Sequence, residues 1–233
     1  MRLDALTFDI DDTLWDNGPV MAHLEAEHYR WLDERIQHAD AFPLEEYAAR
    51  RMAFAATLTD RRGDVTYVRR EVLHRILLEH GIQEPDAGAL TEQAIDYMLE
   101  LRHRVEPYPE VDPLLETLAK RYRLAVITNG NVDVTRLPLA RHFDVCLKAG
   151  EIGMPKPDER VFLHALEALG GVDPRHAIHV GDSWEHDIEP AARLGMQAVW
   201  IDIFDQPRPL PGNVHRVRHV RELPKVLERL EGA

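Results

Sequence analysis

The chain has 233 residues, of which 45% are hydrophobic and 30% charged, a composition typical of a soluble globular protein. Its formal net charge of −13 argues against nucleic acid or a membrane surface as the main partner, but it permits a small phosphorylated ligand. The single cysteine, Cys146, argues against a disulfide framework or a multi-cysteine metal site and fits a reducing cytoplasm. The sequence shows no apolar run of about 18 residues and no apolar signal segment, so we expect neither a membrane span nor export.

Short runs rich in Val, Ile and Phe recur along the chain, and turn-forming or acidic residues flank them. Runs that are apolar on both faces are typical of buried parallel strands. The predicted strands are residues 3–8, 124–128, 145–147, 177–180 and 198–201, with a short last strand after a Pro-rich loop at 207–211.

Helical patterns separate the last four of these runs. One helix is expected to start near Asp112, which is a candidate N-cap; a second starts at Asp158; a third runs from near Ser183 to a glycine cap at Gly195. A final helix is expected around residues 223–230. The alternation predicts an α/β fold with a doubly wound parallel sheet, whose active residues lie at the carboxyl ends of the strands.

The segment between the first two strands breaks this alternation, because it contains no convincing strand. Its apolar periodicity predicts helices at about 19–38, 43–58, 65–80 and 88–103. We therefore predict an α/β core formed by residues 1–16 and 105–233, and an all-helical domain, residues 17–104, inserted after the first strand.

Three acids follow the first predicted strand, in the segment Asp9-Ile10-Asp11-Asp12-Thr13. Residues two apart in extended backbone face the same side, so Asp9 and Asp11 are expected to address one site. Crowded carboxylates repel one another unless a cation lies among them, and Mg²⁺ prefers such oxygen ligands. The alternative is an acidic turn in which Asp11 or Asp12 caps the next helix.

Three later segments also place polar residues at strand ends or before helices. Thr128 and Asn129 end a strand and can present backbone N–H groups to an anion, although Asn-Gly is also a common turn. Lys156 lies between two prolines, which hold it on non-helical backbone, whereas a lone lysine is more often solvated. Asp182 follows another strand and Asp187 comes soon after; the alternative there is a capped helix with exposed acids.

Taken together and in order, these segments resemble the four motifs of the haloacid dehalogenase superfamily. The matching residues are Asp9 to Thr13, then Thr128, then Lys156, then Asp182 with Asp187. The resemblance covers essentially the whole chain, because the helical insertion looks like the C1 cap of that family. It implies a Rossmann-like core and a cap that closes over the active site.

The resemblance also implies roles for the acids. Asp9 would be the nucleophile that accepts a phosphoryl group, and Asp11 would be the general acid and base. The expected cofactor is Mg²⁺, bound by the Asp9 side chain, the backbone carbonyl of Asp11 and Asp182.

Further residues are implied to support these acids. Thr128, the backbone N–H of Asn129, and Lys156 would bind phosphate oxygens. Ser183 and Asp187 would orient Lys156 or a metal-bound water. Thr13 would shape the turn that carries the general acid.

The acid at position 11 separates the branches of the superfamily. Dehalogenases lack an acid there because a halide leaves without a proton, so Asp11 favours phosphate chemistry. The phosphonate-cleaving branch needs a cap lysine, and residues 17–104 contain none. A phosphomutase is the alternative enzyme, and a non-catalytic phosphate-binding module is the alternative outside enzymes.

The predicted function is therefore a cytoplasmic, Mg²⁺-dependent phosphomonoester hydrolase acting on a small phosphorylated metabolite, with no nucleic acid or membrane partner. At finer grain, residues 5–17, 64–66, 127–131 and 179–182 resemble bacterial phosphatases of flavin mononucleotide and phosphoribitylaminouracil. The sequence leaves the oligomeric state and the physiological substrate open.

Two groups of residues in the insertion are candidates for substrate contact. Arg61, Arg62 and Arg69 would meet an anionic tail, although a solvated turn is favoured for them. An aromatic group would stack on a planar ring or, as is more common, pack between helices. The aromatic candidates are Tyr29, Trp31, Tyr67 and Tyr97.

Overall fold

A computed structural model describes residues 2–59, 61 and 63–232. In this part of the chain, one sheet of 6 parallel strands has the order β3-β2-β1-β4-β5-β6. The strands are β1 (Ala5–Phe8), β2 (Arg123–Thr128), β3 (Val145–Lys148), β4 (Ala177–Gly181), β5 (Gln197–Ile201) and β6 (Val214–Val217). The predicted strands are thus confirmed, with ends that differ by one or two residues. Because β1 lies between β2 and β4, the strand order reverses there and opens a crevice at their carboxyl ends.

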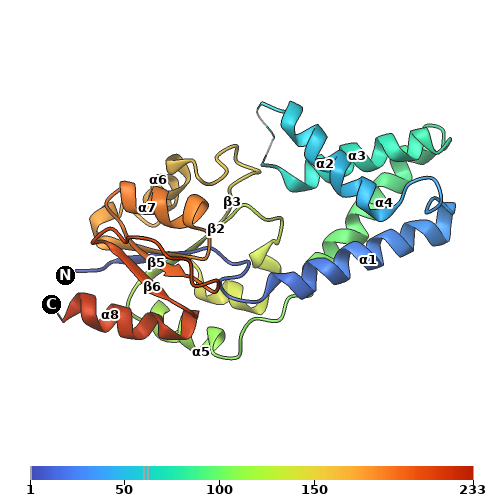
Figure 1. Cartoon of the computed structure of the whole chain (residues 1–233). Helices are drawn as coiled ribbons and strands as arrows, with labels where there is room; N and C mark the ends of the chain where they lie inside the picture. The colour runs from blue at the N-terminus through green and yellow to red at the C-terminus, as the bar shows by residue number, and fades with distance from the viewer. Residues whose placement is uncertain (1, 60, 62, 233) are drawn as a thin grey trace.

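Helices cover both faces of the sheet, as a doubly wound fold requires (Figure 1). On one face, Leu6 and Phe8 pack in a cluster with α5 (Val111–Ala119) and α8 (Leu223–Glu231). On the other face, Ala5 packs in a cluster with α6 (Glu159–Ala168) and α7 (Glu189–Arg193). Alternate residues of β1 therefore pack into the cores on opposite faces of the sheet. This is why the sequence of this strand is mainly apolar on both faces.

The starts of two helices test the predicted caps. Asp158 caps α6 as expected, accepting a hydrogen bond from the backbone N–H of Arg160. Asp112 was expected to cap α5, but this prediction is wrong, because the helix already begins at Val111. The Asp112 carboxylate instead accepts hydrogen bonds from Arg141 and His142.

The segment between β1 and β2 is largely helical and contributes no strand to the described sheet. Its long helices are α1 (Asn17–Ile36), α2 (Leu44–Thr57), α3 (Val65–Glu79) and α4 (Asp86–Arg102). They pack on one another around buried residues such as Leu32, Ile76 and Met98, and they lie to one side of the sheet (Figure 1). The observed helices match the predicted ones closely, while the division into two domains at residues 16 and 104 stays a prediction.

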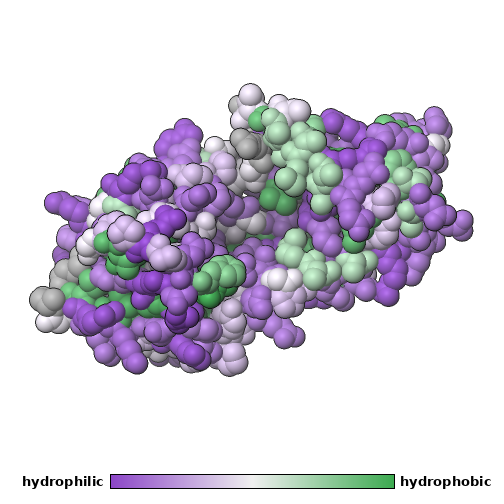
Figure 2. All heavy atoms as spheres, viewed as in Figure 1, coloured by the Kyte–Doolittle hydropathy of each residue, from purple (hydrophilic) through white to green (hydrophobic). Residues whose placement is uncertain are grey.

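The visible face of the molecule is mainly hydrophilic, with small apolar areas scattered over it (Figure 2). This agrees with the excess of acidic residues in the sequence. Within the described ranges, no helix combines the length and the apolarity that crossing a membrane demands.

Candidate active site

A hollow of about 180 Å³ lies at the carboxyl ends of β1, β2 and β4. All four motif segments predicted from the sequence contribute to its walls. The lining includes the predicted residues Asp9, Asp11, Thr128, Asn129, Lys156, Asp182, Ser183 and Asp187, together with Asp12, Gly130 and His186. Thr13 is buried and is not part of the lining; its hydroxyl has no hydrogen-bond partner among the described residues.

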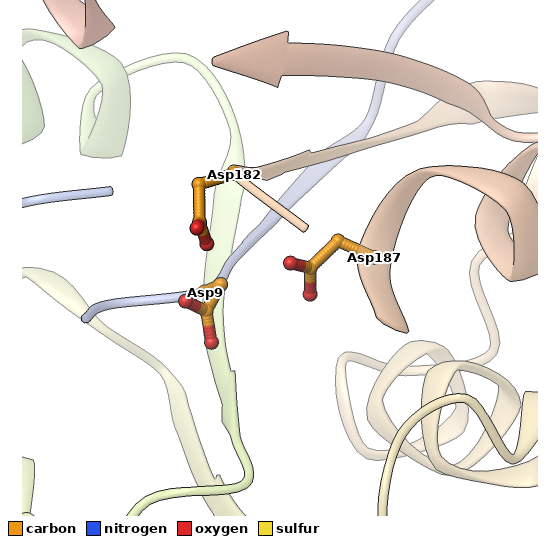
Figure 3. A group of neighbouring side chains, drawn as sticks. All are labelled: Asp9, Asp182 and Asp187. Atoms are coloured by element: carbon orange, nitrogen blue, oxygen red, sulfur yellow. The ribbon is translucent and has the colours of Figure 1, made fainter. Parts of the chain in front are cut away.

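Three carboxylates converge in this hollow. One oxygen from each of Asp9, Asp182 and Asp187 lies within 4.8 Å of the others. Figure 3 shows that they come from separate parts of the fold and point toward a common space. Such a concentration of negative charge is costly to bury, so the fold must compensate for it.

Lys156 supplies part of this compensation. Its Nζ donates hydrogen bonds to Oδ1 of Asp9 at 2.6 Å and to Oδ1 of Asp187 at 2.5 Å. Burial by itself would lower the pKa of Lys156, but the two carboxylates outweigh it and raise the pKa. The lysine therefore remains charged inside the protein, which is the state that binds a phosphate oxygen.

Asn129 holds the backbone of Lys156 in place. Its Oδ1 accepts from the lysine N–H at 2.8 Å, and its Nδ2 donates to the lysine carbonyl at 2.8 Å. The amide side chain thus acts as a reciprocal clamp, and the loops after β2 and β3 are joined through it. Sequence reasoning assigned the backbone N–H of Asn129 to phosphate, and it gave no hint of this second role for the side chain.

The remaining negative charge fits a divalent cation. Burial and the nearby Asp187 and Asp12 carboxylates raise the pKa of Asp182 to about 7. Burial also raises the pKa of Asp9 well above its usual range, despite the ion pair with Lys156. When all three carboxylates are ionised, one ammonium leaves two of their negative charges uncompensated, and hard oxygen ligands of this kind suit Mg²⁺.

Asp187 differs from Asp9 and Asp182 in the direction of its pKa shift. Burial alone would raise its pKa, but Lys156 and His179 outweigh burial and lower it. Its Oδ2 also accepts from the backbone N–H of Ser183 at 3.0 Å. Asp187 therefore stays ionised beside the lysine, and Ser183 contacts the carboxylate through its backbone.

His179 is a buried residue that sequence reasoning did not place in the site. Its Nε2 lies 3.1 Å from Oδ1 of Asp187, and its Nδ1 lies 2.8 Å from the hydroxyl of Thr7. Burial lowers its pKa. The alternation along β4 could have suggested that His179 faces the same side as Gly181, but nothing in the sequence indicated a partner for it.

The Asp11 carboxylate points to partners other than the acidic cluster. Its Oδ1 accepts from Nε1 of Trp15 at 3.0 Å, and its Oδ2 lies 2.5 Å from Nη2 of Arg102. Asp11 still lines the hollow with Asp9, in line with the expectation that both address one site. Trp15 and Arg102 were not predicted as site residues: Trp15 lies in the stretch of resemblance at residues 5–17 but was given no role, and Arg102 lies outside every motif.

The substrate candidates in the insertion are mostly engaged by other residues. Arg61 pairs with Asp64 and stacks over Tyr67, and Arg69 is buried against Glu25. Arg62 lies outside the described residues. The predicted aromatic candidates make ring contacts inside the insertion, among them a stacked pair formed by Trp31 and Tyr97. These contacts favour helix packing over a free stacking surface.

The chain matches known proteins along most of its length. Residues 3–195 match the family model described as haloacid dehalogenase-like hydrolase. The chain is 32% identical over 223 residues to 5-amino-6-(5-phospho-D-ribitylamino)uracil phosphatase YigB of Escherichia coli, with 96% of this chain and 91% of that protein covered. It is also 38% identical over 126 residues to phosphoserine phosphatase of Thermus thermophilus, covering 50% of each.

A solved structure of a protein named 2-haloacid dehalogenase, from Pseudomonas syringae pv. Tomato, has a TM-score of 0.90 and 36% identity to this chain. The alignment covers 98% of this chain and 99% of that one. A structure of a HAD phosphatase from Thermococcus onnurineus, at 24% identity and a TM-score of 0.64, shares the fold. Together with the acidic site at the strand ends, these matches show that the chain is an enzyme of the haloacid dehalogenase-like hydrolase family.

Proposed function

We propose that this hydrolase cleaves small phosphomonoesters through a phosphoryl group carried on Asp9. The observation that carries the proposal is the position of the Asp9 carboxylate, 2.6 Å from the Lys156 ammonium and grouped with Asp182 and Asp187. A nucleophilic carboxylate needs positive charge beside it to approach an anionic phosphate. The named phosphatases among the relatives support the same activity.

The reaction would proceed in two steps. An oxygen of Asp9 attacks phosphorus, the bond from phosphorus to the ester oxygen breaks, and Asp11 gives its proton to the departing alcohol. Water then attacks the same phosphorus, Asp11 takes up a proton from it, and the bond to Asp9 breaks to release inorganic phosphate. Lys156, Thr128 and the backbone N–H of Asn129 would hold the phosphate oxygens during both steps.

The cofactor would be Mg²⁺, held by Asp9, Asp182 and the backbone carbonyl of Asp11, with Asp187 close by. When bound, the ion would screen the charge between the carboxylates and the phosphate oxygens. Ser183 and Asp187 would keep Lys156 oriented, and Thr13 would support the turn that carries Asp11. The helical insertion would act as a cap that excludes water, and the enzyme would work in the cytoplasm on a soluble substrate.

The substrate class is proposed from the relatives. The Escherichia coli protein is named for a phosphoribitylamino compound, in which the phosphate ester is borne by a polyol chain. Flavin mononucleotide carries its phosphate on a similar chain, and the Escherichia coli YjjG protein is named a pyrimidine 5'-nucleotidase. We therefore propose a phosphate ester of a polyol or sugar attached to a heterocycle.

The direct test is phosphate release from a panel of such esters with and without Mg²⁺. We expect release that depends on Mg²⁺, and a loss of at least about 10³-fold in kcat for Asp9→Asn, because the nucleophile is gone. Asp86→Asn, at an exposed position at the start of α4, is the matched control and should retain full activity. Phosphate release that Asp9→Asn leaves intact would disprove the role of Asp9.

Two other activities are distinguishable in the same assay. Because the Pseudomonas syringae relative is named a 2-haloacid dehalogenase, 2-haloacids are the second substrate class to test, with halide release as the readout. The presence of an acid at Asp11 argues against 2-haloacids as substrates, because a departing halide needs no proton. A phosphomutase would return labelled phosphate to the product, whereas the phosphatase would release nearly all label to water. A phosphate-binding module would bind phosphate without any turnover.

A further inference from the structure

Arg102 connects the helical insertion to the acid of the core. It is the last residue of α4, and its side chain is only 3% exposed. Its Nη2 lies 2.5 Å from Oδ2 of Asp11, and its Nε donates to Oδ1 of Asn131 at 3.2 Å. A single guanidinium thus contacts the loop after β1 and the loop after β2 at once, through two nitrogens whose relative positions are fixed by the planar group.

The opposite oxygen of Asp11 is also held. Trp15, which is 1% exposed, donates from Nε1 to Oδ1 at 3.0 Å. A carboxylate with no partners rotates about its terminal torsion with little resistance, because that torsion is broad. With donors on both oxygens, the Asp11 carboxyl plane is fixed from the core by Trp15 and from the insertion by Arg102.

There is no spare room between this pair and Gly130. A Cβ placed on Gly130 would lie 2.7 Å from Oδ2 of Asp11 and 3.3 Å from Nη2 of Arg102. The same Cβ would lie 3.2 Å from the hydroxyl of Thr128, a predicted phosphate ligand. The pair is therefore packed directly against the phosphate-binding loop, and a glycine is required where they meet.

Asn131 extends the connection to a second helix of the insertion. Its Nδ2 donates to the hydroxyl of Thr66, in the first turn of α3, at 3.2 Å and contacts the sulfur of Met98 in α4. The turn before α3 also touches the core, since a Cβ on Gly63 would lie 2.6 Å from the Cβ of Pro155. The Arg102 contact is hence part of a wider interface between the insertion and the core.

We propose that Arg102 is a positioning residue. Through it, the helical insertion packed against the core fixes the orientation of the Asp11 carboxyl for proton transfer to the leaving group. This inference rests on the proposed function, because it presumes that Asp11 is the general acid. A proton donor must lie within hydrogen-bond reach of the leaving oxygen in the correct orientation, so loss of Arg102 removes alignment and leaves the acid in place.

The test compares two esters that differ in their need for an acid. p-Nitrophenyl phosphate has a leaving group stable as an anion, whereas an alkyl phosphate such as glycerol 2-phosphate requires a proton on the departing oxygen. For Arg102→Met we expect kcat/KM to fall about 10²-fold with the alkyl ester and less than about 3-fold with the nitrophenyl ester. Asp11→Asn, measured beside it, should show the same selectivity with a larger loss.

Two further variants separate positioning from folding. Arg102→Lys keeps the charge but replaces two nitrogens at a fixed spacing with one, so it should recover only part of the alkyl-ester activity. Asn131→Ala leaves Arg102 present but releases its Nε, and it should show the same leaving-group selectivity in a weaker form. Arg70→Met is the matched control, because Arg70 pairs with Glu92 within the insertion and touches no site residue.

Equal losses with both esters in the soluble Arg102 and Asn131 variants would overturn the inference. Nη1 of Arg102 is buried without a hydrogen-bond partner among the described residues, so a rival role is direct contact with the substrate. That role predicts a rise in KM for both esters and no selectivity in kcat. If wild type releases phosphate neither from these two esters nor from any ester of the panel above, the proposed function fails. If wild type and Asp11→Asn behave as expected and Arg102→Met shows no selectivity, only the positioning role fails.

Discussion

Lys156 and Asp9 are separated by 147 positions in the sequence, yet the lysine Nζ donates a 2.6 Å hydrogen bond to Oδ1 of the aspartate. The same Nζ bonds Asp187 at 2.5 Å, so one ammonium lies between two buried carboxylates. A charged pair that is cut off from water stabilises the fold only while both partners are present. The contact is thus at once a feature of the reaction site and a point where the fold is vulnerable.

Replacing the lysine should therefore destabilise the protein as well as inactivate it. We expect Lys156→Met to lower the free energy of unfolding by about 3–5 kcal/mol at pH 8, because Asp9 and Asp187 lose their counter-charge. Urea titration followed by circular dichroism measures this loss. Lys120→Met is the matched control, since Lys120 makes an exposed pair with Glu116, and it should change stability by less than about 1 kcal/mol.

The deficit of Lys156→Met, meaning its loss in free energy of unfolding relative to wild type, should decrease as the pH is lowered from 8 to 5. In the wild type, Lys156 lowers the pKa of Asp187. The stability that the ionised Asp187 contributes is therefore lost only as the pH falls through the folded pKa, which lies below 3.8. Without the lysine, the buried carboxylates become neutral at a higher pH by taking up protons, which relieves the uncompensated charge. A deficit that is equal at pH 8 and pH 5 would contradict this account of the pair.

Binding of Mg²⁺ should strengthen with pH across the neutral range. The pKa of Asp182 is raised to about 7, so below that pH a proton occupies a carboxylate that the ion requires. For the proton displaced from Asp182, the affinity should fall about tenfold per pH unit below 7. Titration calorimetry between pH 5.5 and 8.5 measures both the affinity and the released protons.

Thermal unfolding gives an independent measurement of this coupling between protonation of the carboxylates and binding of Mg²⁺. A raised pKa in the folded state, as in Asp182 and Asp9, makes the metal-free protein lose stability as the pH rises from 4 to 7. Histidines with lowered pKa, such as His179 and His28, act in the opposite direction. The difference in Tm with and without Mg²⁺ reports the contribution of the carboxylates separately from that of the histidines. This difference should grow with pH in wild type and be largely lost in Asp182→Asn.

Much of the fold was predictable because buried parallel strands have a simple sequence pattern. A run such as residues 124–128 is apolar on both faces, and the polar residues that end it fall at the carboxyl edge of the sheet. The order of these strand ends brings Thr128, Asp9 and Asp182 together once the topology is known. The N-cap of α5 was wrongly assigned to Asp112, because an acid in the first turn resembles an acid at the cap.

Other parts of the site could not be predicted, because they depend on contacts between residues far apart in sequence. Arg102 ends a helix, where a basic residue is expected for the helix dipole alone, and its reach to Asp11 spans 91 positions. His179 lies inside a strand that is otherwise apolar or glycine, so its bond to Asp187 emerges only from the fold. The motifs therefore predicted which residues gather at the candidate site, and the structure adds the contacts that orient them.

The amide clamp on Lys156 yields a prediction about phosphate binding. Asn129→Ala removes two hydrogen bonds to the lysine backbone, which should cost about 1–3 kcal/mol of stability and raise the Ki of inorganic phosphate as a competitive inhibitor. Asn213→Ala is the matched control, because the Asn213 side chain also makes two hydrogen bonds to the backbone, in its case both to carbonyls, but does not line the hollow. It should lose similar stability with an unchanged Ki, and a parallel rise in Ki would refute the clamp.

The close packing of Gly181 against Asp187 makes this glycine the most sensitive small residue of the site. A Cβ on Gly181 would lie 2.5 Å from Cγ and 2.7 Å from Oδ2 of Asp187, and the glycine has no positive φ that would add backbone strain. Gly181→Ala should therefore act through steric displacement of Asp187 alone, costing about 1–3 kcal/mol. Because Asp187 also holds Lys156, the same variant should lose most of its phosphatase activity.

Gly212→Ala is the matched control, since no heavy atom beyond its chain neighbours lies within 4 Å of its added Cβ. It should leave both Tm and kcat unchanged. The added Cβ would also lie 2.6 Å from the Cβ of Asp187, so Asp187→Gly is needed to remove every obstructing atom. Gly181→Ala should therefore cost less stability in an Asp187→Gly background than in wild type, while the double variant remains inactive. If relief of the clash restored stability and activity together, Asp187 would be only a packing residue, and its role in orienting Lys156 would be wrong.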